Sequence, residues 1–475
     1  MSGGLYVCLD QGGHGSRAVV FDGRGRARAR AHRPVATRRP RPGWVEQDPE
    51  ELLASLRAVL AETRRRLGAR AGAVRAAALA TQRSSIVCWD RHDGTPLSPV
   101  LSWQDRRAAG ELRALAPRAG EIHRRTGLVL SPHYGASKLR WCLDHLPAVA
   151  AAARGGRLAA GPLASFLAHR LAAGAPPLAD PANAARTLLW NLATGDWDPW
   201  LLECFRIPRE VLPECVPSRH RFGELRDWPL PLALVTGDQP AALFAGGRPE
   251  AAVAYVTLGT GAFVQRVAAR LPARADGLLR GLAYRDAGEA VYTLEGTVNG
   301  AASALDWAAG ELGLDPADLP GRLAAALDRD DLSVVFLNAV SGLGAPFWRA
   351  DLPSRFVGEG DPDQRLAAVA ESIVFLLQTN LEVMEDHLGP ARRLQAAGGL
   401  AAADGLCQRL ADLARVPVLR PAEREATARG LAWLLAGKPR DWAAAGAARF
   451  APRAAPGLAA RYRRWRAALD QALAA

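Results

Sequence analysis

The stretch LYVCLDQGGHGSRAVVFD, residues 5–22, decides the fold class, because it joins two β-type runs through a glycine-rich turn. This pattern is typical of a β-hairpin. A similar unit, AYVTLGTGAFVQRV, occupies residues 254–267. One strand–glycine turn–strand unit in each half of the chain predicts two related domains that face each other.

Strands and helices alternate after each hairpin. In the first half we expect a helix over residues 50–67, strands over 74–80, 85–90 and 232–235, and a helix that begins at Pro240. In the second half we expect helices over 301–312, 362–387 and 406–415, and a strand over 395–399. This alternation predicts an α/β protein. The run GGRPE interrupts it at 246–250, so we place an N-terminal domain at residues 1–247 and a C-terminal domain at 248–475.

Composition argues against several classes of protein. The chain has 475 residues, of which 49% are hydrophobic, and this is typical of a globular protein. The net charge is +12, but the densest basic run, residues 24–41, has no recognition motif. We interpret that run as a solvated edge and expect no nucleic-acid partner.

The cysteine pattern and the hydropathy also exclude some classes. The six cysteines are scattered without a C-x-x-C pair, so neither a zinc site nor a disulfide framework is indicated. The first residues lack the apolar run of a signal peptide. No stretch approaches the roughly 20 apolar residues that span a membrane. We therefore expect no membrane association and a cytoplasmic location.

The two glycine turns are the first candidates for chemistry. Glycines allow consecutive backbone N–H groups to point into one concavity, which can hold phosphate oxygens. The sequence contains no G-x-x-x-x-G-K-[ST], so a nucleotide-using enzyme would need another phosphate cradle, and paired hairpins offer one. The alternative is that each turn only connects two strands.

Two aspartates stand at the ends of predicted strands. Asp10 lies at the mouth of the first turn, where a carboxylate can hold waters of a Mg²⁺ ion, although it could simply initiate the turn. Asp238 lies between a buried-type strand and a helix start. There it could accept the proton of a substrate hydroxyl that attacks a phosphorus atom, or it could serve as a helix N-cap.

Taken in order, short segments spread over residues 5–437 resemble the FGGY family of carbohydrate kinases, and its glycerol kinases most closely. The segments are LDQG (9–12), SRAVV (16–20), PGWVEQDP (42–49), QR (82–83), WQ (103–104), NAART (183–187), GDQ (237–239), AALF (241–244), GTG (259–261), LEG (294–296), GLGAPFW (342–348) and GG (398–399). The resemblance implies two actin-like, ribonuclease-H-like domains with a nucleotide cleft between them.

The resemblance also implies a set of roles, with ATP and Mg²⁺ as cofactors. Asp238 would be the catalytic base and Asp10 would lie near the metal. The implied substrate-binding residues are Arg83, Ser84, Trp103, His133, Tyr134, Gln239 and Phe263. The implied nucleotide-binding residues are Gly12, Gly13, His14, Arg17, Gly259, Thr260, Gly261, Ala302, Asp306, Gly398, Gly399 and Ala403.

Several of these positions depart from the family pattern. Ser84 stands where glycerol kinases have Glu, and His133 stands where they have Tyr, with Tyr134 adjacent. Serine replaces a charge-assisted acceptor and leaves volume for a larger polyol or a sugar. Other departures are Gly13, His14 and Gly15 in the first turn, and Ala302, Asp306 and Ala403 near the expected adenosine site.

The sequence therefore supports three possible functions, which we give in order of decreasing support. The first is an ATP-dependent kinase that phosphorylates a small polyol or sugar, with glycerol as the leading substrate. The second is a kinase for a larger polyol or a ketose such as ribulose or xylulose. The third is a catalytically weak, nucleotide-binding regulatory protein, against which Asp10, Asp238, Gln239 and Thr260 argue together. Many relatives of this kind form dimers or tetramers, so a homodimer or homotetramer is compatible with the resemblance.

Overall fold

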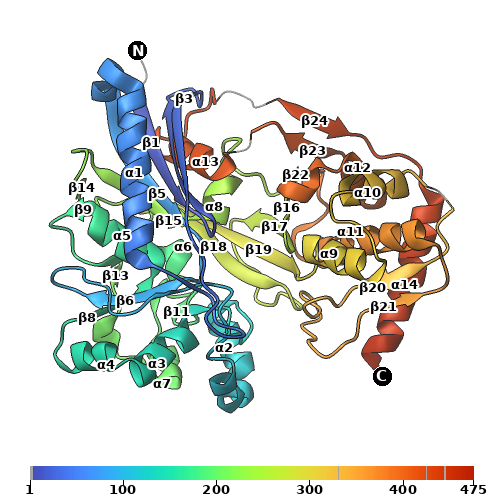
Figure 1. The fold of residues 1–475 in the computed structure, drawn as a ribbon, viewed down its shortest axis with the longest axis horizontal. Helices are drawn as coiled ribbons and strands as arrows, with labels where there is room; N and C mark the ends of the chain where they lie inside the picture. Colours follow the sequence, from blue (N-terminus) through green and yellow to red (C-terminus); the bar gives the residue numbers. More distant parts are fainter. Residues whose placement is uncertain (1–3, 330, 424, 443–445, 475) are drawn as a thin grey trace. The chain divides into compact units, whose positions relative to one another are not determined.

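The computed structural model describes residues 4–329, 331–423, 425–442 and 446–474. The chain forms two compact units (Figure 1). Unit 1 comprises Met1–Pro249, Gly281–Tyr292 and Glu425–Ala444, and unit 2 comprises Glu250–Arg280, Thr293–Arg424 and Ala445–Ala475. The split of the domains at residue 247 stays a prediction, and the units differ from it in that unit 1 takes two later segments of the chain.

Unit 1 is built on a five-stranded sheet with the strand order β15-β5-β1-β2-β3. Neighbours β1, β2 and β3 are antiparallel, whereas β5 and β15 run parallel to β1. This order is the one expected of a ribonuclease-H-like domain. The strands are β1 (Leu5–Gln11), β2 (Gly15–Asp22), β3 (Ala27–Pro34), β5 (Val74–Thr81) and β15 (Leu232–Gly237).

Helices pack against this sheet and bury its apolar side chains. α1 (Pro49–Leu67) lies along β2 and β3 (Figure 1), and the side chain of Asp48 caps its first turn by accepting the N–H of Glu50 at 2.9 Å. α5 (Leu163–Leu171) shares a core with α1 and the sheet. α13 (Ala426–Leu435) contacts β1, β5 and α8 (Asp238–Leu243).

Smaller elements complete unit 1. A second sheet has the order β4-β7-β6-β8. The remaining elements are β4 (Glu46–Gln47), β6 (Ile86–Asp90), β7 (Val100–Leu101), α2 (Ala119–Thr126), α3 (Gly135–His145), α4 (Pro147–Arg154), β8 (Leu158–Pro162), β9 (Ala172–Ala173), β10 (Leu178–Ala179), α6 (Pro181–Ala184), β11 (Trp190–Asn191), β12 (Asp196–Trp197), α7 (Pro199–Phe205), β13 (Glu214–Cys215) and β14 (Glu224–Leu225).

Unit 2 repeats the architecture of unit 1. The sheet that contains most of its strands has the order β18-β19-β17-β16-β22-β23-β24, in which β16 is antiparallel to β17 and parallel to β22. Most of β18 and the start of β19 fall in the Gly281–Tyr292 segment of unit 1. The strands are β16 (Val253–Leu258), β17 (Ala262–Ala268), β18 (Leu279–Arg285), β19 (Ala290–Val298), β22 (Arg393–Ala397), β23 (Val418–Pro421) and β24 (Ala447–Phe450). Since β17-β16-β22-β23 corresponds to β2-β1-β5-β15, the prediction of two related domains is confirmed.

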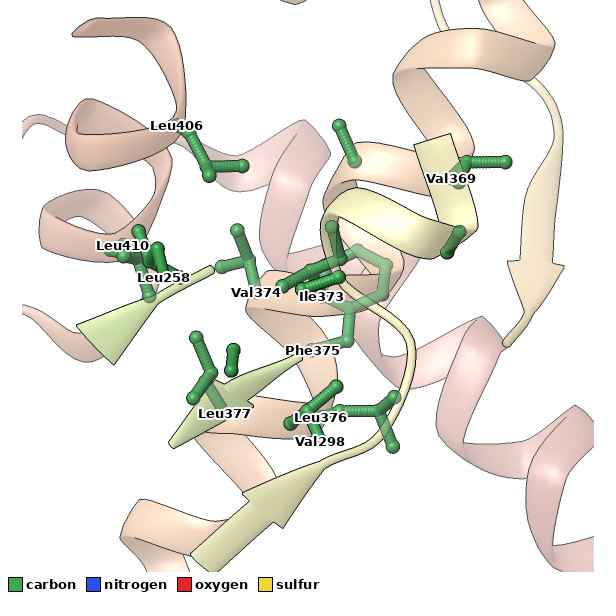
Figure 2. Packing of buried hydrophobic residues seen from close by; sticks show 14 of the residues in the cluster. Leu258, Val298, Val369, Ile373, Val374, Phe375, Leu376, Leu377, Leu406 and Leu410 are labelled. Carbon is green, nitrogen blue, oxygen red and sulfur yellow. The ribbon is translucent and has the colours of Figure 1, made fainter. Parts of the chain in front are cut away.

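The core of unit 2 forms around α11 (Pro362–Leu388). Figure 2 shows Ile373, Val374 and Leu377 of this helix packed among side chains from the sheet and from α12 (Asp404–Ala414). The other elements of unit 2 are α9 (Ala302–Glu311), α10 (Leu319–Leu327), β20 (Val335–Leu337), β21 (Arg355–Val357) and α14 (Pro456–Ala474).

α11 also bears on the expectation that no stretch could span a membrane. Among the described residues, it is the one helix that is long and apolar enough to do so by length and composition. However, 83% of the apolar window is buried inside the protein, so its composition is that of a core helix.

The predicted elements are present, with one shift that matters for the site. α8 begins at Asp238, two residues before the predicted start at Pro240, and Gly237 is its N-cap. Asp238 is therefore the first residue of the helix rather than its cap. The basic run forms β3, the exposed edge strand of the first sheet, as predicted.

Candidate active site

The candidate site of unit 1 forms where three parallel strands end together. In the sheet register Gln11 of β1 pairs with Thr81 of β5, and Thr81 pairs with Gly237 of β15. The residues that follow these strands therefore emerge at one edge. They are the first glycine turn, the Arg83–Ser84 pair and Asp238, and ligands of open α/β sheets bind at such an edge.

The carboxyl group of Asp238 has a pKa above its ordinary value, and this property suits a proton acceptor. Burial raises the pKa of its carboxyl group, while the charges of Arg83 and Arg186 lower it. Its Oδ1 accepts the backbone N–H of Gln239 at 2.7 Å. α13 contacts α8 at this point, because the Thr427 hydroxyl donates to the Asp238 backbone carbonyl at 3.3 Å.

Asp10 is the second carboxylate at this edge. Burial and the charge of Asp238 raise its pKa to about 7, and Arg17, 3.6 Å away, opposes the shift. Arg17 also lies 4.0 Å from Glu425 at the start of α13. Asp10 Oδ1 is buried and accepts no hydrogen bond from the described residues, so it has a lone pair available for another ligand.

Asp10 was predicted to lie near Mg²⁺, and its unpaired oxygen fits that ion. No group of three or more His, Cys, Asp or Glu side chains comes together in the described part of the chain. Mg²⁺ often takes only one or two carboxylates and completes its shell with waters and substrate phosphates. A single buried carboxylate is therefore a sufficient protein contribution.

Arg83 and Gln239 form a polar pair beside Asp238. The Arg83 guanidinium donates to Gln239 Oε1, and Arg83 is only 8% exposed. A Cβ on Gly237 would lie 2.5 Å from Cγ and Cδ of Arg83. The glycine before Asp238 therefore makes room for the arginine.

Ser84 has two unusual properties. Its φ of 63° places it in the left-handed region, which residues other than glycine rarely adopt. Its hydroxyl is buried and has no hydrogen-bond partner among the described residues. An orphaned buried hydroxyl at a candidate site is a ready contact for a substrate hydroxyl.

Three aromatic rings lie together next to Ser84. His133 contacts Trp103 at 5.5 Å and Tyr134 at 4.9 Å between ring centroids. The backbone N–H of Trp103 donates to Ser85 Oγ at 3.1 Å, which links this residue to the segment that follows Arg83 and Ser84. Burial, together with nearby Lys138 and Arg186, lowers the pKa of His133, which favours the neutral imidazole.

The first glycine turn is bonded to two side chains, those of Gln47 and Thr37, for which the sequence predicted no role. Gly12 N–H donates to Gly15 carbonyl at 3.0 Å. The Gly13 carbonyl accepts Gln47 Nε2 at 2.9 Å and Thr37 Oγ1 at 3.2 Å. His14 is exposed at the tip.

The corresponding turn of unit 2 packs against the first turn of α9. The Gly259 carbonyl accepts the N–H of Ala302 at 3.0 Å, and the Thr260 carbonyl accepts that of Ala301 at 3.0 Å. A Cβ on Gly261 would lie 2.9 Å from the Val298 carbonyl oxygen. Thr260 is exposed, so its hydroxyl is accessible.

The predicted adenosine residues gather near the same end of β16. Gly398 has a φ of 97°, and a Cβ there would collide with the backbone of Leu258. Gly399 begins the short 3-10 helix Gly399–Ala402, and Ala403 caps α12. Ala302 and Asp306 are one turn apart on α9 and share a face of that helix, with Asp306 exposed.

The structure thus places the predicted residues in two groups. Unit 1 brings together Asp10, Gly12, Gly13, His14, Arg17, Arg83, Ser84, Trp103, His133, Tyr134, Asp238 and Gln239. Unit 2 contains Gly259, Thr260, Gly261, Phe263, Ala302, Asp306, Gly398, Gly399 and Ala403. The sequence did not assign roles to Gln47, Lys138, Arg186, Glu425 and Thr427, because their contacts come from distant parts of the chain.

The fold and these residues define a class of protein, a small-molecule kinase that uses no P-loop. Comparison with known proteins gives the same class of protein. Residues 5–244 match the N-terminal domain of the FGGY family of carbohydrate kinases, and residues 254–437 match its C-terminal domain. The chain therefore belongs to the FGGY family of carbohydrate kinases.

Individual proteins of the family are similar to this chain in sequence or in fold. The chain is 38% identical over 439 residues to a glycerol kinase of Citrifermentans bemidjiense, covering 90% of this chain and 89% of the relative. It is 39% identical over 441 residues to a glycerol kinase of Alkalilimnicola ehrlichii, with the same coverage. The fold is similar to that of Plasmodium falciparum glycerol kinase with ADP, with a TM-score of 0.89 at 23% identity and 99% coverage of both chains. It is also similar to xylulose kinase from Rhodospirillum rubrum, with a TM-score of 0.86 at 22% identity and 98% coverage of both chains.

Proposed function

We propose that this protein transfers the γ-phosphoryl group of ATP to a hydroxyl of glycerol and forms glycerol 3-phosphate. The observation that carries the proposal is the group formed by Asp238, Arg83 and Gln239 at the carboxyl edge of the sheet. Relatives at 38–39% identity are named glycerol kinases, which supports this substrate.

Asp238 acts as the general base in this proposal. Its carboxylate accepts the proton of the attacking hydroxyl while the oxygen forms a bond to the γ-phosphorus and the bond to the β–γ bridging oxygen breaks, which releases ADP. Arg83 and Gln239 orient neighbouring hydroxyls of the acceptor through hydrogen bonds. The Trp103 and His133 rings provide apolar surface for the carbon chain and exclude water.

Phosphate oxygens are bound by glycine turns in this proposal. In unit 2, Gly259–Gly261 offer backbone N–H groups and Thr260 adds a hydroxyl, and in unit 1 Gly12 and Gly13 offer the same kind of donor. Asp10 would hold Mg²⁺, which supplies charge neutralisation at the phosphates. The enzyme would work in the cytoplasm, where ATP is available.

A larger polyol or a ketose is the second candidate, and Ser84 favours it. The buried hydroxyl of Ser84 is unpaired, and serine is smaller than the glutamate of glycerol kinases. Both properties suit an acceptor with more carbons and more hydroxyls.

The test measures ADP release by the purified protein with ATP and Mg²⁺ against glycerol, erythritol, xylitol, ribulose and xylulose. We expect the highest kcat/KM with glycerol. A higher value with a longer acceptor would replace glycerol by the second candidate. No release above background with any acceptor would contradict the kinase proposal and favour a nucleotide-binding regulatory protein.

A further inference from the structure

Lys138 lies in the first turn of α3 and is fully buried. It is one of only two lysines in the chain, the other being Lys438, although lysine and arginine together number 60. Almost every other cationic position is therefore occupied by arginine. The use of lysine at a fully buried position calls for a property of the ammonium group that a guanidinium lacks.

That property is the direction of its three N–H bonds. Lys138 Nζ donates to the backbone carbonyls of Ser84 at 2.8 Å, Ser102 at 2.9 Å and His133 at 2.8 Å. An ammonium group has three donors that diverge from one atom, and all three are used here. The donors of a guanidinium lie in one plane on three separate nitrogens, so they cannot replace this arrangement.

The three carbonyls belong to three of the segments that form the candidate acceptor site. Ser84 follows Arg83, Ser102 precedes Trp103, and His133 precedes Tyr134. These segments are far apart in sequence, and the closest two are separated by 18 residues. A single buried atom therefore joins three of the proposed acceptor-binding segments of unit 1.

The local environment supports a role specific to this junction. Ser84 has the left-handed φ of 63°, and the bond from Lys138 to its carbonyl fixes that conformation. Asp105 is engaged by Arg107 at 2.8 Å, so Lys138 relies on carbonyl dipoles. Burial lowers the pKa of the Lys138 ammonium to about 7, with Arg107 and Arg106 adding to the shift and Asp105 opposing it.

We infer that Lys138 is a positioning residue that sets the relative placement of the Arg83–Ser84, Trp103 and His133–Tyr134 segments and thereby determines acceptor binding. This inference rests on the proposed function, since it treats those segments as the acceptor site. Lys138 contacts only backbone carbonyls in its three hydrogen bonds, so it acts through the segments and not on the substrate.

The test compares Lys138→Met, Lys138→Arg and the matched control Lys438→Met. Methionine keeps the length of the side chain and removes the donors, whereas arginine keeps the charge and changes the geometry. For both Lys138 variants we expect KM for the acceptor to rise roughly tenfold or more, and KM for ATP to stay within about twofold. Lys438→Met should change neither. An equal loss in every kinetic constant, or no change in acceptor KM, would overturn the inference.

Hydrogen exchange of the protein without substrate provides a second test, which does not depend on the reaction. Amides of residues 83–86, 102–104 and 131–134 should exchange faster in Lys138→Met than in the wild type, and those of unit 2 should not. Unchanged exchange in the three segments would overturn the inference. If the wild type phosphorylates no acceptor, the proposed function fails. The comparison of hydrogen exchange between wild type and Lys138→Met still tests whether Lys138 holds the three segments together.

A measurement on the wild type covers the case in which the Lys138 variants do not fold. Because the chain has two lysines, ¹³C labelling of lysine Cε gives two NMR signals. Saturating acceptor should shift the Lys138 signal and leave that of Lys438 in place. A Lys138 signal that does not respond to an acceptor that is turned over would overturn the inference.

Discussion

Gly237 and Arg83 are packed so closely that a Cβ on the glycine would lie 2.5 Å from two carbons of the arginine side chain. Gly237 also precedes Asp238 and caps its helix. The absence of a side chain at Gly237 thus links the position of Arg83, the proposed acceptor-binding residue, to that of Asp238, the proposed base.

We expect Gly237→Ala to weaken acceptor binding while the protein stays folded. The φ of −85° at Gly237 is accessible to alanine, so the backbone can remain in place and Arg83 must move instead. The acceptor KM should rise about tenfold or more. Steady-state kinetics with Gly246→Ala as the control checks this, because a Cβ at Gly246 meets nothing within 4 Å. Equal kinetics in the two variants would contradict the link.

Ser84→Glu should shift the acceptor preference toward glycerol. A carboxylate at this position supplies the charged acceptor that serine lacks, and hydrogen bonds to charged groups contribute about 1.5–3 kcal/mol. We expect the glycerol KM to fall and the KM of five-carbon acceptors to rise. Ser84→Gln is the matched control, since it has the size of glutamate without the charge. If both variants change the KM of glycerol alike, charge does not set the preference.

The activity should fall on the acid side at a higher pH than an ordinary aspartate would give. Burial raises the pKa of Asp238, and its protonated form cannot accept the substrate proton. Arg186→Gln removes a positive charge that lowers this pKa, so the acid limb should move to still higher pH. Measurement of kcat at saturating substrates against pH checks both statements. A limb that stays in place or moves to lower pH in the variant would be inconsistent with Asp238 as the base.

Without metal, Asp10 should destabilise the fold at neutral pH. Its pKa is raised from 3.8 to about 7, so the folded state binds the proton more tightly than the unfolded state. The stabilising effect of the proton is complete below pH 3.8 and is lost as the pH rises through about 7. Relative to Asp10→Asn, the wild type should lose at most about 4 kcal/mol between these limits.

Urea unfolding in EDTA at both ends of that pH range measures the effect. A difference between wild type and Asp10→Asn that does not depend on pH would contradict it. With Mg²⁺ and ATP present, Asp10→Asn should also need a higher Mg²⁺ concentration for half-maximal activity.

Gly261→Ala should affect the nucleotide and not the acceptor. A Cβ there would approach the Val298 carbonyl oxygen to 2.9 Å, which would displace the Gly259–Gly261 turn from the start of α9. We expect the KM for ATP to rise several-fold. Gly310→Ala, in the same unit with nothing within 4 Å of the added Cβ, is the control. A rise in acceptor KM alone would argue against a nucleotide role for the turn.

Local sequence signals were sufficient for the paired hairpins and for part of the other strands and helices, whereas elements such as β19 and α14 were not predicted. The alternation of β-type runs with helical spacing is a short-range pattern, so β1, β2, β16 and β17 could be predicted within two residues. The start of α8 was predicted two residues late, because the proline rule for helix starts favours Pro240 although Gly237 caps the helix.

The supporting residues of the site could not be predicted in this way. Lys138 is one buried lysine on an amphipathic helix, and only the folded chain brings three carbonyls to its amine. Glu425 and Thr427 lie almost 190 residues or more from the partners they contact, Arg17 and Asp238. The left-handed backbone of Ser84 likewise has no signature in the sequence, since serine rarely adopts it.

The central claim is that Asp238 is the base of an ATP-dependent phosphoryl transfer to a small polyol. Single-turnover formation of the phosphate ester from ATP and glycerol, followed by ³¹P NMR, tests it most directly in wild type, Asp238→Asn and the control Asp470→Asn, which lies on the exposed side of α14. We predict ester formation by the wild type and the control, and a rate at least about 10²-fold lower in Asp238→Asn with the acceptor still bound. Ester formation by Asp238→Asn at the wild-type rate would contradict the account.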